Sequence, residues 1–261
     1  MSSSGSAEKD WKQNLLNRMD LIKQEKFRHD LPYIKASDIG GQFFCEMKVD
    51  LDYVEGRIES QSMIDGTQIH DEVIAMEKTT VDKIIENIES GGIFLAAFTL
   101  ISRHDDLVLC GIPDAIVFKD SKPVYIIELK TATKNIDKIY DGQLGQATVY
   151  SFLLEEMGFD CSQLTNVIVK VKRPFDLRKN NRQKFLYGVV GSLFTRMEQA
   201  FIEKSKGSVY IHTQKYKRSD ALEIINKIKG YWMGEREPTP TTNPNKCRSC
   251  SFKTTCKSSL A

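Results

Sequence analysis

Two acidic side chains and one lysine are the residues of this sequence best placed to do chemistry. Gly111-Ile-Pro-Asp114 is followed by Glu128-Leu-Lys130, and both stretches lie in apolar segments typical of neighbouring β-strands. Because side chains alternate along a strand, Glu128 and Lys130 should share one face with Asp114 opposite them, and Leu129 should face the apolar side. Two carboxylates held close together repel each other, and a divalent cation, Mg²⁺ or Mn²⁺, relieves that repulsion. Such a metal and a lysine together suit the hydrolysis of phosphodiesters.

These three residues alone also have a simpler interpretation, in which Asp114 caps a bulge and Glu128 pairs with Lys130 at a strand end. The stretch Gln146-Ala-Thr-Val-Tyr150 adds to the chemical interpretation, because an i to i+4 spacing puts Gln146 and Tyr150 on one face of the next predicted helix. Taken singly, such residues are typical of a solvent-facing glutamine and a tyrosine at the edge of a core.

In this order and spacing, the three motifs resemble the PD-(D/E)XK nuclease superfamily, and specifically its RecB-like branch. Gly66-Thr-Gln-Ile-His70 is similar to the upstream histidine motif of that branch. The resemblance implies an α/β fold, a mixed central sheet flanked by helices. It also implies site roles: His70, Asp114 and Glu128 hold the metal with the Leu129 carbonyl, Lys130 positions or activates water, and Gln146 and Tyr150 support Lys130 and the DNA backbone.

A second cluster consists of cysteines near the C-terminus. Cys247, Cys250 and Cys256 follow a C-x2-C-x5-C spacing, and thiols this dense typically bind a metal. A tetrahedral thiolate site needs a fourth ligand, for which Cys45 is the candidate. Zinc and an iron–sulfur cluster are both compatible with this spacing. The other two cysteines, Cys110 and Cys161, lie in apolar surroundings and are predicted to be core residues.

One cysteine before the nuclease motifs and three after them resemble the CRISPR-associated exonuclease family (Cas type four) and the iron–sulfur nuclease domain of AddB. This resemblance implies a [4Fe-4S] cluster on Cys45, Cys247, Cys250 and Cys256 that joins the C-terminal segment to the N-terminal helical region. It also implies action on single-stranded DNA ends, with the CRISPR integrase complex as a partner. The chain departs from the family in having Glu46, where many members have proline, and in its N-terminal extension and helical additions.

The elements that must position these residues follow from the hydrophobic periodicity. It predicts helices over 11–28, 39–53, 66–88, 136–157, 182–204 and 219–232, and strands over 94–102, 107–118, 124–130 and 166–172. Tight turns between the first three strands predict antiparallel pairing, and the strand–helix–strand unit around 136–157 predicts a parallel crossover. The expected organisation is an N-terminal extension (1–33), a helical region with the first cysteine (34–92), a nuclease core with helical additions (93–235) and a cysteine module (236–261).

Composition and charge narrow the class of protein. The chain has 261 residues, 41% of them hydrophobic and 28% charged, which excludes collagen-like and disordered classes. The formal net charge is only +2, so a nucleic-acid site requires local clusters of basic residues. The candidate DNA contacts are Lys172, Arg173, Arg178, Lys179 and Arg182, preceded by Lys170; a second cluster is Lys215-Tyr-Lys217-Arg218. No membrane span or secretory signal is expected, and the predicted location is cytoplasmic.

Three other functions remain compatible with these features. A stand-alone repair or recombination nuclease has the same chemistry, and a nuclease stabilised by zinc differs only in the cysteine site. The third is a non-catalytic DNA-binding or assembly subunit, which the intact set of Asp114, Glu128, Lys130, Gln146 and Tyr150 argues against.

Overall fold

The computed structural model describes residues 10–22, 26–56, 81–173 and 179–261, without the side chains of 179–183. Most of the predicted helix 66–88 lies outside this description. The described helices are α1 (Trp11–Asn17), α2 (Ala36–Gln42), α3 (Glu46–Val54), α5 (Val81–Ser90), α6 (Asp141–Glu156), α7 (Lys179–Thr195), α8 (Glu198–Lys204), α9 (Arg218–Trp232) and α10 (Pro244–Arg248). Short 3-10 turns cover Arg18–Ile22 and Arg28–Asp30.

The described strands form two mixed sheets, in agreement with the predicted α/β class. The larger sheet has the order β2 (Ile93–Ala96), β5 (Ala115–Lys119), β6 (Lys122–Ala132), β7 (Thr165–Lys172) and β8 (Val209–Lys215). The smaller has the order β1 (Ile34–Lys35), β4 (Leu107–Gly111) and β3 (Leu100–His104). The predicted antiparallel pairing is confirmed by β3–β4 and β5–β6, and the predicted crossover by the parallel β6–β7 pair around α6.

The two sheets arise because two predicted strands are each divided. The apolar run 94–102 becomes β2 and β3, and the run 107–118 becomes β4 and β5. In the second run the interruption includes Pro113, which has no N–H with which to continue a ladder. Asp114 therefore lies at the entrance to β5, where the chain passes from the smaller sheet to the larger one.

Two predicted helices are also divided, and two others are shorter than predicted. The helix predicted over 136–157 begins only at Asp141. The segment 39–53 is interrupted after α2, where the N–H groups of Phe44 and Cys45 both donate to the Gly41 carbonyl. Cys45 thus precedes α3 with extended backbone instead of lying inside a helix. The segment 182–204 divides at Arg196, whose φ of 56° is left-handed and ends α7. The first helix ends at Asn17 and continues only as a 3-10 turn.

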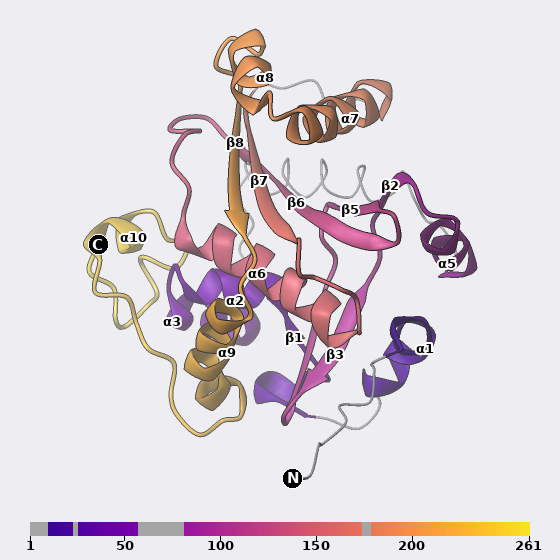
Figure 1. Cartoon of the computed structure of the whole chain (residues 1–261). Coiled ribbons are helices and arrows are strands. Elements are labelled where there is room, and N and C mark those ends of the chain that lie inside the picture. Colours follow the sequence, from indigo (N-terminus) through magenta and orange to yellow (C-terminus); the bar gives the residue numbers. More distant parts are fainter. Residues whose placement is uncertain (1–9, 23–25, 57–80, 174–178) are drawn as a thin grey trace.

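Hydrophobic cores cover both faces of the larger sheet. On one face, α7 and α8 pack on Val117, Ile127 and Val169; on the other, side chains such as Ile116 and Ile126 join the core that contains α6 and α9. Figure 1 shows α7 and α8 on one side of the strands and α6 on the other. Alternate strand residues thus serve opposite layers, as the period of two requires.

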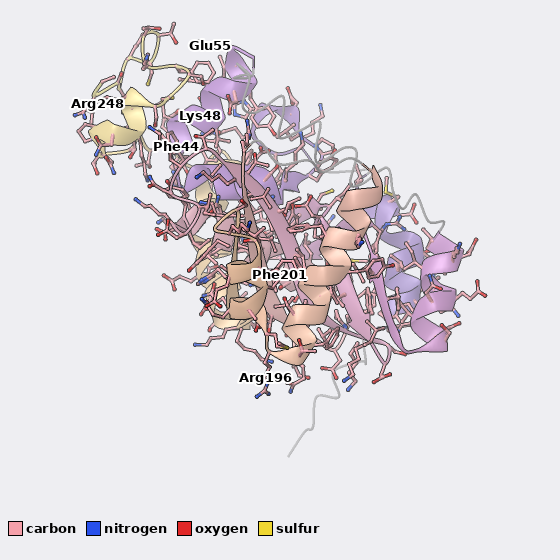
Figure 2. The ribbon with its side chains drawn as sticks, turned by 90° about the horizontal axis from the view of Figure 1, so that it is seen from above. Phe44, Lys48, Glu55, Arg196, Phe201 and Arg248 are labelled. Carbon is pink, nitrogen blue, oxygen red and sulfur yellow. The ribbon has the colours of Figure 1, made fainter. Side chains whose placement is uncertain are left out.

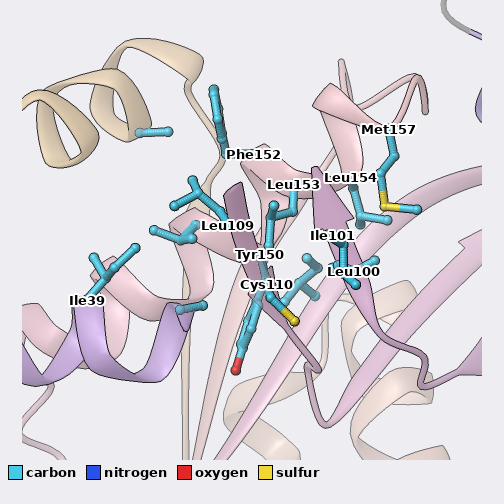
Figure 3. Packing of buried hydrophobic residues seen from close by; sticks show 14 of the residues in the cluster. Ile39, Leu100, Ile101, Leu109, Cys110, Tyr150, Phe152, Leu153, Leu154 and Met157 are labelled. Atoms are coloured by element: carbon cyan, nitrogen blue, oxygen red, sulfur yellow. The ribbon is translucent and has the colours of Figure 1, made fainter. Parts of the chain in front are cut away.

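Helix α6 is the central element, since it is buried along most of its length. Its side chains from Tyr150 to Leu154 pack against Leu100, Ile101 and Leu109 of the smaller sheet (Figure 3). The helix ends at Gly158, as predicted, where φ is +101°. Cys110 and Cys161 are buried in this core, which confirms their prediction, and burial raises the pKa of the Cys110 thiol to about 11.

Among the described residues, no helix combines the length and the apolar character that crossing a membrane demands.

Candidate active site

Asp114, Glu128 and Lys130 lie together at the junction of β5 and β6. Asp114 Oδ2 accepts a hydrogen bond of 2.6 Å from the backbone N–H of Leu129, and Glu128 Oε1 lies 2.6 Å from Lys130 Nζ. The two carboxylic residues are 3% and 2% exposed, whereas the lysine side chain is 29% exposed. Leu129 packs into the core under α7, on the opposite side of the strand as predicted. The alternation along β6 therefore puts the charged groups on one face.

The negative charge of Glu128 disfavours the ionised form of Asp114. Burial, and then the neighbouring Glu128, raise the pKa of Asp114 well above its ordinary value, and the Leu129 N–H opposes this shift. Oε2 of Glu128 is buried and accepts no hydrogen bond from the residues that the structure describes. A buried carboxylate oxygen without a donor, beside a second carboxylate, is a donor set that fits a hard divalent cation.

Lys130 retains its proton in this environment. Burial alone would lower the pKa of its ammonium, but Glu128, and then Asp114, more than offset burial and raise that pKa. A positive charge at this position is suited to orienting a nucleophile or stabilising a phosphoryl oxygen.

Gln146 and Tyr150 extend this network from α6. Lys130 Nζ donates to Gln146 Oε1 at 3.1 Å, and Gln146 Nε2 donates to the Tyr150 hydroxyl at 2.8 Å. Burial and Glu128 raise the pKa of Tyr150 well above its ordinary value, although the bond from Gln146 opposes this. The phenol ring is inserted beside Cys110 with its hydroxyl directed away from the aliphatic core (Figure 3). The helix face predicted from the i to i+4 spacing thus holds the lysine in place.

Gly111 makes this insertion possible. A Cβ at position 111 would lie 2.4 Å from Cε1 of Tyr150, closer than any real contact allows. The glycine that opens the Gly111-Ile-Pro-Asp114 motif thus provides space for the tyrosine that ends the second motif.

A pocket that the sequence analysis did not predict opens beside Lys130 and Gln146. It has a volume of about 390 Å³ and lies between α2 and the first turn of α6. Gly40 and Gly142 let the two backbones meet there, because a Cβ on Gly142 would lie 2.4 Å from the Gly40 carbonyl oxygen. Phe43, Phe44 and Tyr140 also line this cavity, which we call the aromatic pocket. The glycines of the sequence were its only signal.

The structure describes only some of the other residues predicted to bind the metal or DNA. His70 and Arg178 lie outside the described residues, as do the side chains of Lys179 and Arg182. Lys172 is exposed at the end of β7, two residues beyond the position paired with Lys130, and Arg173 donates to Thr131 Oγ1.

Some members of the two basic clusters proposed from the sequence make structural contacts. Lys170 is 2% exposed, so it does not belong to a solvated basic strip. In the second cluster, Tyr216 is buried and donates to Glu155 Oε2, and Arg218 pairs with Glu155 and Glu156. Those groups attach the start of α9 to α6.

All four predicted cluster cysteines line one small cavity of about 20 Å³. The backbone N–H groups of Thr241 and Phe252 each lie 3.4 Å from a sulfur, that of Cys45 and that of Cys250 respectively. Burial raises the pKa of Cys250, and the Cys45 and Cys256 thiols add to this, whereas the Phe252 N–H and the Lys48 ammonium oppose it. No group of three or more Cys, His, Asp or Glu among the described residues is arranged to hold a single metal ion.

Glu46 has a structural role that the sequence analysis missed. Its carboxylate accepts hydrogen bonds from Arg236, Thr239 and Gln42. Burial tends to raise the pKa of Glu46, but these bonds, that of Arg236 foremost, lower it overall. Glu46 thus attaches the segment after α9 to the start of α3. In Figure 1 this C-terminal segment runs beside α3, far from it in sequence.

Comparison with known proteins identifies the family. Residues 52–257 match the model of the PD-(D/E)XK nuclease superfamily, and none of the curated proteins matches the chain. The crystal structure of SSO0001 is similar in fold, with a TM-score of 0.50 and 14% sequence identity over 96% of this chain and 95% of that one. The superfamily model covers most of the sequence, including Asp114, Glu128, Lys130, Gln146 and Tyr150. The chain therefore belongs to the PD-(D/E)XK nuclease superfamily.

Proposed function

We propose that the chain is a metal-dependent nuclease that hydrolyses phosphodiester bonds of DNA. The observation that carries this proposal is the buried Asp114–Glu128 pair with Lys130 bonded to both Glu128 and Gln146. Members of this superfamily are nucleases that use divalent metals such as Mg²⁺ or Mn²⁺. Asp114, Glu128 and the Leu129 carbonyl would hold the ion, with His70 as a further ligand.

The reaction divides between the metal and the side chains of the chain. When bound, the ion would lower the pKa of a water and neutralise charge on the phosphate. Lys130 supplies a fixed positive charge for the phosphoryl oxygens or the attacking water. Gln146 limits the lysine to one orientation because its Oε1 accepts a hydrogen bond from Lys130 Nζ, and the Tyr150 hydroxyl in turn accepts one from Gln146 Nε2. The network therefore holds the ammonium in place before the substrate arrives.

The finer proposal is an exonuclease that acts on single-stranded DNA ends, as in the CRISPR-associated exonuclease family. Its support is the resemblance in motif order together with the common cavity of Cys45, Cys247, Cys250 and Cys256. In that setting the partner is the CRISPR integrase complex, and the task is to trim DNA before its integration. A repair or recombination nuclease is the alternative pathway for the same chemistry.

For the cysteine cavity we propose a [4Fe-4S] cluster in preference to zinc. The four thiols surround one space, yet they are not arranged around a single ion. A cluster separates its thiolate ligands more widely than one ion does, and N–H groups directed at the sulfurs of Cys45 and Cys250 suit its charge.

The test follows single-stranded DNA labelled at either end, with Mg²⁺ or Mn²⁺ and then with EDTA, for anaerobically purified wild type and Lys130→Ala. We expect metal-dependent cleavage that the substitution reduces by a factor of about 100 or more. The matched control is Lys122→Ala on the same strand, whose lysine pairs with Asp160 at the surface. Wild-type protein that binds DNA but never cuts it would instead support the assembly-subunit function.

A further inference from the structure

The aromatic pocket is lined by three aromatic side chains that the cores do not use. Phe43, Phe44 and Tyr140 belong to neither of the two hydrophobic cores as the structure describes them, and Tyr140 is 49% exposed. They share the pocket with Lys130 and Gln146 of the candidate active site. Aromatic rings placed beside a catalytic site, without a role in core packing, indicate a surface for a flat ligand group.

The pocket is held in shape from beneath. The ring of Phe43 rests on α6 at Gly145, where a Cβ would lie 2.6 Å from Cε2 of the ring. Tyr140 is the N-cap of α6, and its backbone N–H donates to Gln143 Oε1 at 3.2 Å. Helix α6 therefore fixes the position of both rings.

The buried Lys170 fixes the loop that carries Tyr140. Its Nζ donates to the carbonyls of Lys138 at 2.6 Å and Asn135 at 3.3 Å, and lies 5.1 Å from the centroid of the Tyr140 ring. Lys170 pairs with Lys130 in the register of β7 and β6. The sheet that holds the catalytic lysine therefore also positions the loop at the pocket rim.

The charge of the pocket suits a ligand that bears phosphate. Lys130 and Lys246 both line it, against one carboxylate, Asp141. Lys246 Nζ donates to the Phe43 carbonyl at 2.8 Å and lies 6.0 Å from the centroid of the Phe44 ring. In Figure 2, Phe44 lies near the C-terminal segment, far from Arg196 and Phe201. Cationic and aromatic groups side by side are the combination that binds single-stranded nucleic acid, by contacting phosphate and stacking on bases.

We propose that the aromatic pocket binds an unpaired base of the DNA strand being cut, with Tyr140 and Phe44 as the residues that select single-stranded DNA. The inference rests on the proposed nuclease function and assigns a base-binding subsite beside Lys130. Base stacking tolerates any sequence because every base presents a π-face, but a base within a duplex has both faces covered by its neighbours. The pocket therefore selects for strandedness and not for sequence.

The test measures equilibrium binding, so that its outcome is independent of cleavage. In EDTA, fluorescence anisotropy compares a short labelled oligothymidylate with an abasic strand of the same length and charge. We expect wild type to bind oligothymidylate about 5- to 100-fold more tightly than the abasic strand, as stacking on aromatic side chains implies. Tyr140→Ala and Phe44→Ala should lose most of this ratio while leaving the affinity for the abasic strand unchanged.

Two controls separate stacking from general damage. Tyr187→Ala removes an equally exposed aromatic ring on α7 and should leave the ratio unchanged, and Tyr140→Phe should retain it. A wild type that binds both strands equally, or variants that weaken both to the same extent, would overturn the proposal. Failure of the nuclease function would appear separately, as absence of cleavage by wild type in Mn²⁺.

Discussion

At the level of single residues, the proximity of Asp114 and Glu128 lowers the stability of the folded protein when no metal is bound and Asp114 is ionised. The raised pKa of Asp114 means that the folded protein binds a proton that the unfolded chain releases at lower pH. The stability contributed by this group is complete below the ordinary aspartate pKa, and it is lost as the pH rises through the raised value. A bound divalent cation replaces the proton and removes this penalty.

We therefore predict that Mn²⁺ raises the melting temperature more at neutral than at acidic pH. Thermal melting in EDTA and in Mn²⁺, across that pH range, measures the effect. Asp114→Asn should abolish the dependence, whereas Asp160→Asn should not, because Asp160 is a surface acid whose pKa is lowered to about 2 by Lys122. A metal-induced shift that is the same at all pH values would contradict the prediction.

Tyr150 provides a test of positioning. Tyr150→Phe removes the hydroxyl that accepts from Gln146 Nε2, so the amide and then Lys130 lose one constraint. We predict a fall in kcat of about fivefold with little change in KM, since one hydrogen bond contributes about 1 kcal/mol. Tyr216→Phe is the matched control, because its hydroxyl bonds Glu155 away from the site. It should cost similar stability and leave kcat unchanged.

Individual residues differ in how far sequence predicts them. Asp114, Glu128, Lys130, Gln146 and Tyr150 could be found because chemistry requires fixed residue types at fixed spacing, and the structure brings them together. Tyr140 and Glu46 could not, because their partners are chosen by tertiary contacts. Lys170 was misassigned for the same reason, since a lysine on a strand is normally exposed.

At the level of elements, the contact between α2 and α6 determines the floor of the aromatic pocket. Gly142→Ala would place a Cβ against the Gly40 carbonyl and separate the helices. We predict a loss of about 1–3 kcal/mol in the free energy of unfolding, together with weaker binding of DNA. Urea denaturation measures the first and anisotropy the second.

Gly191→Ala is the matched control for this prediction. Gly191 lies in α7, and a Cβ there meets no atom within 4 Å. Alanine should therefore stabilise the protein by about 0.5–1 kcal/mol, as expected in a helix interior. Equal effects of the two substitutions would show that the α2–α6 contact is not close.

Element types were more predictable than element boundaries. Hydrophobic periodicity correctly located α6, α9 and β7, each of which is one unbroken element in the structure. It could not separate β2 from β3 or β4 from β5, since both halves of each run are apolar. The division of a run between two sheets depends on which strands are available as partners, and one segment does not contain that information.

At the level of the whole molecule, the cysteine cavity joins segments that are far apart in the chain. Cys250→Ala should remove iron and visible absorption, and lower stability by about 2–5 kcal/mol, by comparison with other cross-links that close long loops. Iron analysis, absorption spectra and thermal melting of anaerobically purified protein measure these effects. Cys161→Ala should affect packing only, because its thiol is buried in the core beside Ser151. Iron content that is unaffected by Cys250→Ala would contradict the cluster.

The attachment of α3 to the C-terminal segment also sets an order for biosynthesis. Strands β5 and β6, with the acidic pair and Lys130, leave the ribosome well before Arg236 and Cys247. Domains begin to fold as they emerge, so Glu46 and Cys45 must wait for partners made about two hundred residues later. A nascent chain that stops short of Arg236 would carry Asp114, Glu128 and Lys130 but lack the bonds from Arg236 to Glu46 at the start of α3. The contact of Glu46 with Arg236 therefore forms only after the segment around Arg236 has been made.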